Sequence, residues 1–276
     1  MILVDYSNIS ISGILAFTKG DSKLFEEDLL RHLILNSLLS YRKKYPKHGD
    51  MIICCDSGES WRKKIFPYYK ASRKKDRDQS TIDWDELFFF LKKITNEIKE
   101  HMPYKVLKIN SAEGDDCIAV IASSFPGPHV VISNDKDFGQ LQKYSGVKQY
   151  SPLKNEEVSI DNPDKFLKEL IIYGDNSDGV PNIFSDDDTF VTKKRQKSIF
   201  KTKLIKWLEE PFENFATDMD NVKRNKTMID FRYIPTELHN EIIDTFNILE
   251  KNDRRKIQPY FIQKKLRNLL DEIQNF

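Results

Sequence analysis

The stretch VVISNDKD, residues 130–137, joins a short apolar run, as found in buried strands, to two aspartates. The same order, an apolar run followed by an acid, occurs in ILVD at residues 2–5 and in MIICCD at residues 51–56. Further strand-like runs cover residues 105–109 and 147–150, and segments of helical periodicity separate most of these runs. This alternation predicts βαβ units, and hence an α/β fold with a mostly parallel, Rossmann-like sheet flanked by helices.

Nine carboxylates lie at the ends of apolar runs or shortly beyond them, and the parallel strands of an open α/β sheet bring such positions to one edge. Carboxylates that converge repel one another, and divalent cations are the usual means of keeping several ionised together. Hard oxygen ligands favour Mg²⁺ or Mn²⁺, and two such ions about 4 Å apart stabilise in-line displacement at phosphorus. The pattern therefore predicts a metal-dependent phosphodiesterase. The nine are Asp5, Asp56, Glu113, Asp115, Asp116, Asp135, Asp137, Asp175 and Asp178.

Each acidic motif taken alone has another explanation. Residues 113–116 open a helix, and helix capping and the macrodipole would explain one acid there, but three acids in four residues favour metal binding. A DxD motif after a strand, as at residues 135–137, also occurs in glycosyltransferases and phosphatases. The run GDNSDG at residues 174–179 is by itself typical of a polar turn. Only the combination of the motifs indicates a single site.

Basic residues are segregated, although the net charge is only +1. Residues 62–77 contain eight basic residues and one acid, interleaved with aromatic residues, and residues 189–207 contain seven basic residues and no acid. Lysine and arginine suit a phosphate backbone, and aromatic rings accept the stacking of unpaired bases. One lysine-rich run would more simply be a solvated helix face. Two runs that flank a carboxylate-rich pocket favour a nucleic-acid substrate.

Composition excludes several other classes. With 276 residues and 39% hydrophobic content the chain can bury a core. No apolar run is long enough to span a membrane, and the start has no features of a signal peptide, so we expect an intracellular, cytoplasmic protein, or one in the host cytoplasm if the source is a virus. The cysteines, Cys54, Cys55 and Cys117, are expected in the core, and the five scattered histidines form no ligand-spaced pair, which argues against zinc.

The order of the elements predicts two domains. An α/β domain is expected over residues 1–152, with a long basic insertion at 57–82, and a helical domain over residues 153–276. Helical periodicity predicts helices over residues 24–45, 163–173, 199–215, 237–249 and 258–273. A further helix is expected over residues 83–100, with Ser80 or Thr81 as its cap.

Taken together, the motifs resemble the flap endonuclease, or 5′-nuclease, superfamily, and within it the ribonucleases H of T-even bacteriophages. The similarity covers nearly the whole chain and keeps the order of the motifs. It implies a PIN/5′-nuclease-type sheet, a helical arch in the basic insertion, and a helix-three-turn-helix-like element over about residues 163–206. The segments that carry it are Asp5, residues 31–37, Asp56, 61–62, 69–70, Arg73, 83–85, 102–104, 113–116, 133–138, 174–178, 230–231, 233–235 and 260–261.

The resemblance also implies roles for individual residues. Lys70 and Arg73 match positions that steer the scissile phosphate, and Arg62 would add positive charge. A first Mg²⁺ would be surrounded by Asp5, Asp56, Glu113, Asp115 and Asp135, and a second served by Asp137, Asp175 and Asp178, with Asp116 in support. Nucleic-acid contacts would come from Lys63, Lys64, Tyr69, Lys74, Lys75 and Arg77 in the arch, and from Lys193, Lys194, Arg195 and Lys197.

The chain departs from the family in one loop. Many members carry a glycine-rich hairpin that holds phosphate and K⁺, whereas residues 180–188 contain no glycine. K⁺ is therefore not among the expected cofactors, which are two Mg²⁺ ions with Mn²⁺ as a substitute. Duplex contact is expected to depend on the lysines and arginine at residues 193–197 instead.

The implied activity is that of a 5′ to 3′ exonuclease and flap endonuclease with RNase H activity, which removes primers during replication. Its expected partners are 5′-flap or nicked DNA and RNA–DNA hybrids, with a single-strand binding protein and a sliding clamp as family-level expectations, and the expected state is a monomer. Two alternatives stay open: a PIN-type single-strand ribonuclease and a non-catalytic DNA-junction-binding protein. A sugar-nucleotide transferase would explain the DxD motif but not the two basic runs.

Overall fold

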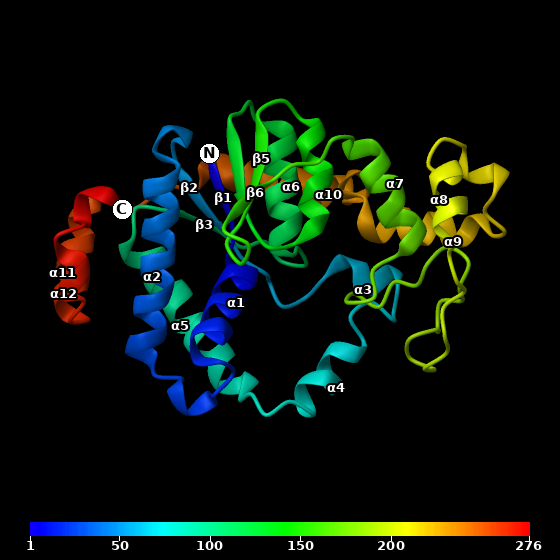
Figure 1. Cartoon of the computed structure of the whole chain (residues 1–276). Helices are drawn as coiled ribbons and strands as arrows, with labels where there is room; N and C mark the ends of the chain where they lie inside the picture. The colour runs from blue at the N-terminus through cyan, green and yellow to red at the C-terminus, as the bar shows by residue number, and fades with distance from the viewer.

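The computed structural model describes all 276 residues and contains one six-stranded sheet with helices on both faces (Figure 1). The strand order is β3-β2-β1-β4-β5-β6, and all neighbours are parallel except β6, which pairs antiparallel with β5. The predicted mostly parallel α/β sheet is therefore confirmed. The strands are β1 (Ile2–Asp5), β2 (Met51–Cys54), β3 (Lys105–Leu107), β4 (His129–Ile132), β5 (Val147–Ser151) and β6 (Glu156–Val158).

The register of the central strands explains where a site can form. Asp5, the last residue of β1, lies opposite Cys54 of β2, and Val4 lies opposite Ile132 of β4. The residues that follow β1, β2 and β4 therefore emerge at the same edge. The order of the sheet changes direction between β1 and β4, and doubly wound sheets bind their ligands at such a point.

Alternate side chains of the strands enter two separate cores. Val4 and Ile132 belong to the core on one face, and Leu3 and Val131 belong to the core on the other face. The first face is covered by α1 (Tyr6–Thr18), α2 (Glu27–Lys44) and α5 (Trp84–His101), and the second by α6 (Gly114–Ser124) and α10 (Thr236–Ile248). The core on the first face extends to α11 (Ile257–Gln263) and α12 (Arg267–Leu270), which lie beyond α2 in Figure 1.

A third core lies beside the sheet and includes part of the basic insertion. It is built by α7 (Pro163–Tyr173), α8 (Lys201–Trp207) and α9 (Met219–Ile229), and Phe66 and Tyr69 of the insertion are buried in it. The insertion contains two short helices, α3 (Trp61–Ile65) and α4 (Ser72–Asp78). In Figure 1, α4 lies away from the sheet, between α3 and the start of α5. One end of the insertion is thus fixed in a core, whereas α4 has no buried residue.

Some helix boundaries differ from those predicted. The cap of α5 is Asp83, whose side chain accepts a hydrogen bond from the Glu86 backbone, and not Ser80 or Thr81. The helix predicted over residues 199–215 is α8 and ends at Trp207, followed by a short 3-10 turn over residues 212–214. The helix predicted over residues 258–273 is split into α11 and α12, because Lys265 between them has a φ of 56°.

Three elements were not predicted from the sequence: α1, α9 and β6. The β6 sequence Glu-Glu-Val has no apolar run, and α9 has buried apolar side chains only at Val222, Met228 and Ile229. The division into domains at residue 152 stays a prediction. Strand β6 and the helices α10, α11 and α12, which share cores with the sheet, follow that position. None of the helices combines the length and apolar content needed to cross a bilayer.

Candidate metal centre and active site

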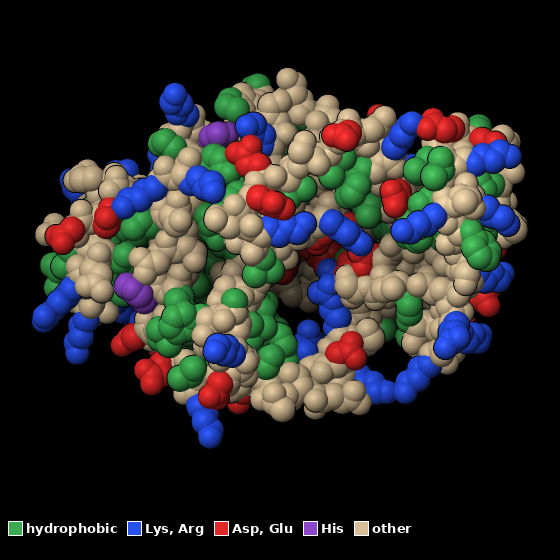
Figure 2. Space-filling view, viewed as in Figure 1, with side chains coloured by type: hydrophobic (Ala, Val, Ile, Leu, Met, Phe, Trp, Pro, Cys, Tyr) green, Lys and Arg blue, Asp and Glu red, His purple; other side chains and the backbone are tan.

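Acidic side chains from distant parts of the chain meet at the edge of the sheet. In the space-filling view they lie at the bottom of a hollow, and Lys and Arg side chains surround its mouth (Figure 2). The cavity measures about 20 Å³, which is enough for one water molecule. Its acidic lining is Asp115, Asp135, Asp137, Asp175 and Asp178, and Arg62, Tyr69, Ser177, Met228, Ile229 and Phe231 complete the wall.

Asp5 and Asp56 lie beside this cavity, at the ends of β1 and β2. Asp5 is buried, and it accepts a hydrogen bond of 2.6 Å from the Ser133 hydroxyl. Burial first of all, and then the charges of Asp56 and Asp135, raise the pKa of Asp5 to about 7. Asp56 accepts a 2.8 Å hydrogen bond from the Gly114 backbone. A side chain at Gly114 would come within 3.2 Å of the Cys54 carbonyl, so glycine lets α6 begin this close to β2.

The negative charges of three lining aspartates, Asp115, Asp135 and Asp137, are not balanced by a salt bridge. Burial raises the pKa of Asp115, and the charges of Asp5 and Asp135 raise it further. Burial and its acidic neighbours likewise raise the pKa of Asp135 and of Asp137. The Oδ1 atom of Asp137 is buried without a hydrogen-bond partner. A nearby cation would relieve both the repulsion and the missing contact.

Glu113 and Asp116 are held by cations from the insertion instead. Arg62 is 3% exposed, and its guanidinium contacts Glu113 at 3.0 Å and Asp116 at 2.9 Å. Burial opposes ionisation of Glu113, but Lys70 and Arg62 outweigh it and lower its pKa to about 2. Asp116 also accepts hydrogen bonds from the Trp61 indole and the Glu113 backbone. Asp116 does not line the cavity, and the capping explanation of the 113–116 motif holds for this residue.

Lys70 and Arg73 lie at the mouth of the cavity. The Lys70 ammonium pairs with Glu113 and lies 3.6 Å from Asp178, and Arg73 contacts Asp178 at 2.6 Å. The backbone N–H of Lys70 also donates to the Asp178 carbonyl. A side chain at Gly179, where φ is +73°, would lie 2.8 Å from the Tyr68 carbonyl. The insertion is therefore joined to the 174–179 turn by its backbone as well as by its charges.

The side chains as they stand do not form a finished metal-binding site. No three Asp, Glu, His or Cys side chains converge closely enough to ligate one ion. Two carboxylates of the site are instead paired with lysines, Glu113 with Lys70 and Asp175 with Lys136. The donors nevertheless suit a hard divalent cation. All of them are carboxylate oxygens, one buried oxygen lacks a partner, and no histidine or thiol lines the cavity.

The residues predicted to contact nucleic acid separate into two groups. Tyr69 is buried, and its hydroxyl lies 2.8 Å from both Glu113 and Asp178, so it holds carboxylates rather than facing solvent. Arg77 is half-buried, with its guanidinium 5.7 Å from the centre of the Phe88 ring. The remaining predicted residues are exposed: Lys63, Lys64, Lys74, Lys75, Lys193, Lys194, Arg195 and Lys197.

One wall of the cavity, formed by residues 228–231, was not predicted from the sequence. Arg62 donates to the Met228 carbonyl at 2.9 Å, and the Gln140 amide donates to the Ile229 carbonyl at 3.1 Å and accepts from the Phe231 backbone. The wall is thus held from both sides. The only signal in the sequence was the Asp230-Phe231 pair within the family resemblance.

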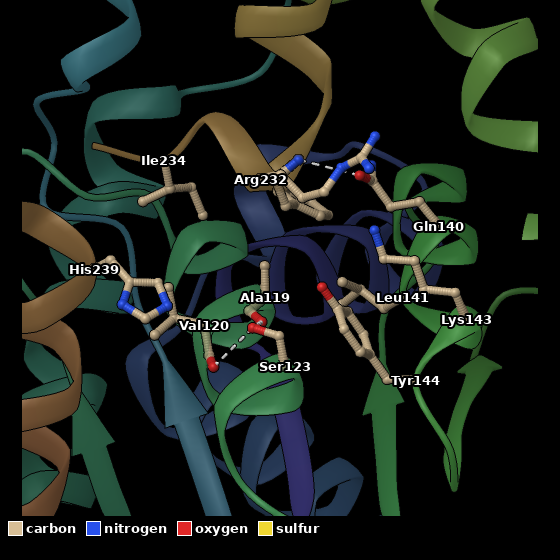
Figure 3. Close-up of a pocket in the computed structure, with 11 residues that line it drawn as sticks. Ala119, Val120, Ser123, Gln140, Leu141, Lys143, Tyr144, Arg232, Ile234 and His239 are labelled. Carbon is tan, nitrogen blue, oxygen red and sulfur yellow. Dashed lines mark hydrogen bonds between the residues drawn. The ribbon is translucent and has the colours of Figure 1, made fainter. Parts of the chain in front are cut away.

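A larger hollow lies on the far side of this wall. It measures about 210 Å³, and Phe231 lines both it and the acidic cavity. Figure 3 shows Lys143, Tyr144, Gln140 and His239 around it. No carboxylate lines this hollow, so the chemistry predicted from the sequence belongs to the smaller, acidic cavity.

Comparison with known proteins gave consistent results over the whole chain. Residues 29–170 match the family described as 5′-3′ exonuclease, N-terminal resolvase-like domain, and residues 162–276 match the family described as T4 RNase H, C terminal. Ribonuclease H of Enterobacteria phage T4 is 33% identical in an alignment that covers 99% of this chain and 95% of the relative.

Solved structures show the same fold at lower identity. A complex of phage T5 flap endonuclease with DNA and metal ions superposes with a TM-score of 0.64 at 18% identity, over 90% of this chain and 98% of that chain. A T5 5′-exonuclease with bound zinc gives the same TM-score, identity and coverage. The architecture of sheet and flanking helices is therefore shared well beyond the range of close sequence similarity.

Proposed function

Because the chain belongs to the 5′-3′ exonuclease family, together with phage T4 ribonuclease H, we propose that it is a divalent-metal-dependent 5′-nuclease. It hydrolyses phosphodiesters in the 5′ strands of DNA duplexes and RNA–DNA hybrids, as a 5′ to 3′ exonuclease and flap endonuclease with RNase H activity. The observation that carries the proposal is the acidic cavity, in which carboxylates from separate strands and turns meet beside Lys70 and Arg73.

The proposed cofactors are two Mg²⁺ ions, or Mn²⁺ in their place, because these ions prefer carboxylate oxygens as ligands. When bound, the ions would lower the pKa of a water molecule and neutralise negative charge at phosphorus. Asp116 supports the set indirectly, because it accepts from the Glu113 backbone. The proposed ligands are Asp5, Asp56, Glu113, Asp115 and Asp135 for one ion and Asp137, Asp175 and Asp178 for the other.

Lys70 and Arg73 are the proposed substrate-contacting cations. The Lys70 ammonium lies between Glu113 and Asp178 at the mouth, where a phosphate would enter. Arg73 is 44% exposed in its side chain, and its planar guanidinium can grip a phosphate with two hydrogen bonds. Positive charge fixed next to the scissile group stabilises the transition state without reorganisation of solvent.

Arg62 and Tyr69 are proposed as positioning residues, because both are buried and hold carboxylates of the site. Arg62 lies in the wall of the cavity, but its guanidinium is occupied by Glu113, Asp116 and the Met228 carbonyl. Tyr69 donates from a single hydroxyl that lies between Glu113 and Asp178. These contacts hold the carboxylates in place before any ligand arrives, which is the condition for a preorganised site.

The helical part after residue 152 is proposed to bind the duplex, and residues 57–82 to form the arch. Two observations support this: the third core gives α7, α8 and α9 their own packing, and the four cations at residues 193–197 are exposed on the loop before α8. A monomer that acts in the host cytoplasm fits the phage origin of the T4 relative. A single-strand binding protein and a sliding clamp are the proposed protein partners.

Cleavage of a 5′-labelled DNA flap and of a matched RNA–DNA hybrid tests the proposal. The native chain is compared with Asp137→Asn, which removes a charge from the cavity, and with Asp244→Asn, which changes an exposed acid on α10. We expect Mg²⁺-dependent release of short 5′ products from the native chain and the Asp244 variant, loss of release in EDTA, and no release from the Asp137 variant. Binding of the flap should survive in all three.

The other outcomes identify the alternatives. Tight flap binding by the native chain with no cleavage under any metal would show a junction-binding protein. Cleavage of single-stranded RNA with no use of a duplex would show a PIN-type ribonuclease.

A further inference from the structure

Lys136 is the one residue of the DKD motif that the proposed chemistry does not use. It lies between Asp135 and Asp137, at the first position of the 3-10 helix η3 (Lys136–Lys143). Its ammonium does not pair with either neighbour. Instead it crosses to the turn after α7, where Nζ lies 3.3 Å from Oδ2 of Asp175.

The two oxygens of Asp175 have different surroundings. Oδ1 accepts three hydrogen bonds within its own turn, from the backbone and hydroxyl of Ser177 and from the backbone of Asp178. Oδ2 has Lys136 as its cation. The first oxygen is therefore committed to the shape of the turn, and the second is the atom that a cation in the cavity would use. A cation on Oδ2 must displace or share Lys136.

Each half of the cavity mouth has its own lysine. Lys70 serves Glu113 and Asp178 on the side of the insertion, and Lys136 serves Asp175 on the side of β4. The Lys136 side chain is 58% exposed, so it can leave for solvent without opening a buried gap.

We propose that Lys136 is the resident counter-ion of Asp175, which bridges η3 to the 174–179 turn in the metal-free protein and competes with a divalent cation for Asp175 Oδ2. The inference rests on the proposed metal-binding function of the cavity. Its consequence is that Lys136 weakens divalent-ion binding at this side and, in exchange, holds the two halves of the cavity together when no ion is bound.

Titration with Mn²⁺ at constant ionic strength, followed by calorimetry, tests this competition. Lys136→Met removes one positive charge at ion-pair distance from Asp175. Mn²⁺ should therefore bind roughly fivefold more tightly at the site to which Asp175 contributes. Lys136→Arg keeps the charge and should bind Mn²⁺ like the native chain. Lys148→Met is the matched control, because Lys148 is 60% exposed and pairs with Glu157 at 3.1 Å on β6, away from the cavity.

Thermal unfolding supplies a second readout. In EDTA the Lys136→Met protein should melt at a lower temperature than the native chain, and saturating Mn²⁺ should remove that difference. A purely structural ion pair would lower the melting temperature equally with and without Mn²⁺, which would overturn the proposal. The fivefold tightening should also vanish when Lys136→Met is combined with Asp175→Asn.

The possible failures are distinguishable. Unchanged or weaker Mn²⁺ binding in Lys136→Met, or equal tightening in Lys148→Met, refutes the competition while native Mn²⁺ binding and cleavage leave the proposed function intact. If the native chain binds no Mn²⁺ and cleaves no substrate, the metal function fails, and the role of Lys136 fails with it.

Discussion

Replacement of Arg62 by methionine distinguishes two roles for this residue: contact with the substrate, and stabilisation of the buried carboxylates around it. As a substrate-contacting cation, Arg62 would affect cleavage but not stability. The structure gives it buried contacts with Glu113, Asp116 and the Met228 carbonyl, at 3.0, 2.9 and 2.9 Å. Arg62→Met keeps much of the side-chain volume and removes the charge, so Glu113 and Asp116 lose their shared partner.

The expected loss is large because the carboxylates cannot escape into water. Asp116 is fully buried and Glu113 is 8% exposed. Removal of one partner from a buried ion pair costs about 3–5 kcal/mol. For a chain of this length the unfolding entropy converts that loss into a fall in Tm of roughly 5–9 °C. Addition of Asp116→Asn removes one of the stranded charges and should recover part of the loss.

Differential scanning calorimetry in EDTA measures this without interference from metal binding. Arg255→Met is the control, because Arg255 is a 90% exposed arginine that pairs with Asp253, and its loss should leave Tm within about a degree of the native value. Cleavage is measured in parallel under Mg²⁺. A Tm for Arg62→Met within about 2 °C of native together with abolished cleavage would refute the reasoning, because that result requires Arg62 to act on the substrate.

Three further outcomes follow from the contacts. Tyr69→Phe removes the donor shared by Glu113 and Asp178, so the cleavage rate should fall about tenfold, while flap binding measured by anisotropy stays unchanged. Burial raises the pKa of Glu97, but Arg31 and other hydrogen-bonded partners outweigh it and lower the pKa to about 2. Its stabilisation is therefore complete above about pH 4.5 and is lost as pH falls toward 2. Glu113 loses stabilisation over the same range in both proteins, so unfolding in urea should show a loss that is about 1–2 kcal/mol larger in the native chain than in Glu97→Gln, after screening by solvent. The last prediction concerns the four exposed cations Lys193, Lys194, Arg195 and Lys197. Their joint replacement by glutamine should reduce the slope of log affinity against log salt by about 3 to 4. An unchanged slope would show that this loop does not contact the duplex.

The parts of the fold that the sequence predicted correctly depend on local patterns. Five of the six strands were predicted. Three of them, β1, β2 and β4, are apolar runs whose alternate side chains enter different cores, and each run is followed by an acid at the same edge of the sheet. The rule for parallel sheets predicts the position of Asp135 and Asp137, which follow β4. Asp115 in α6 and Asp175 and Asp178 in the turn after α7 were assigned to the same site only through the combination of motifs, and all five line one cavity. The 13-residue helix α1 was missed because serine and isoleucine alternate in it and the helical period is weak.

The roles of individual cations could not be read from the sequence, because they depend on contacts between distant segments. Arg62 is buried by the Met228 carbonyl, 166 positions away, and Tyr69 is held by Asp178, 109 positions away. Both residues lie in the basic run of residues 62–77, among lysines that are mostly exposed. Nothing in the run itself distinguishes a cation beneath the carboxylates from one that faces the substrate.

The four cations around the cavity differ in the exposure of their side chains, and this difference predicts how readily each can change its partner. The side chain of Arg62 is 4% exposed, Lys70 15%, Arg73 44% and Lys136 58%. An ion pair is harder to exchange for another partner as it becomes more buried, because the freed carboxylate then keeps its desolvation cost. Arg62 therefore keeps its carboxylates, whereas Lys136 can give up Asp175 to a metal ion and Arg73 can give up Asp178 to bind a phosphate. Lys70 lies between these limits, because it is buried enough to be aligned by Glu113 and close enough to the mouth to reach a phosphate. A site arranged in this way can fold before its metal ions bind and still release its carboxylates to them afterwards.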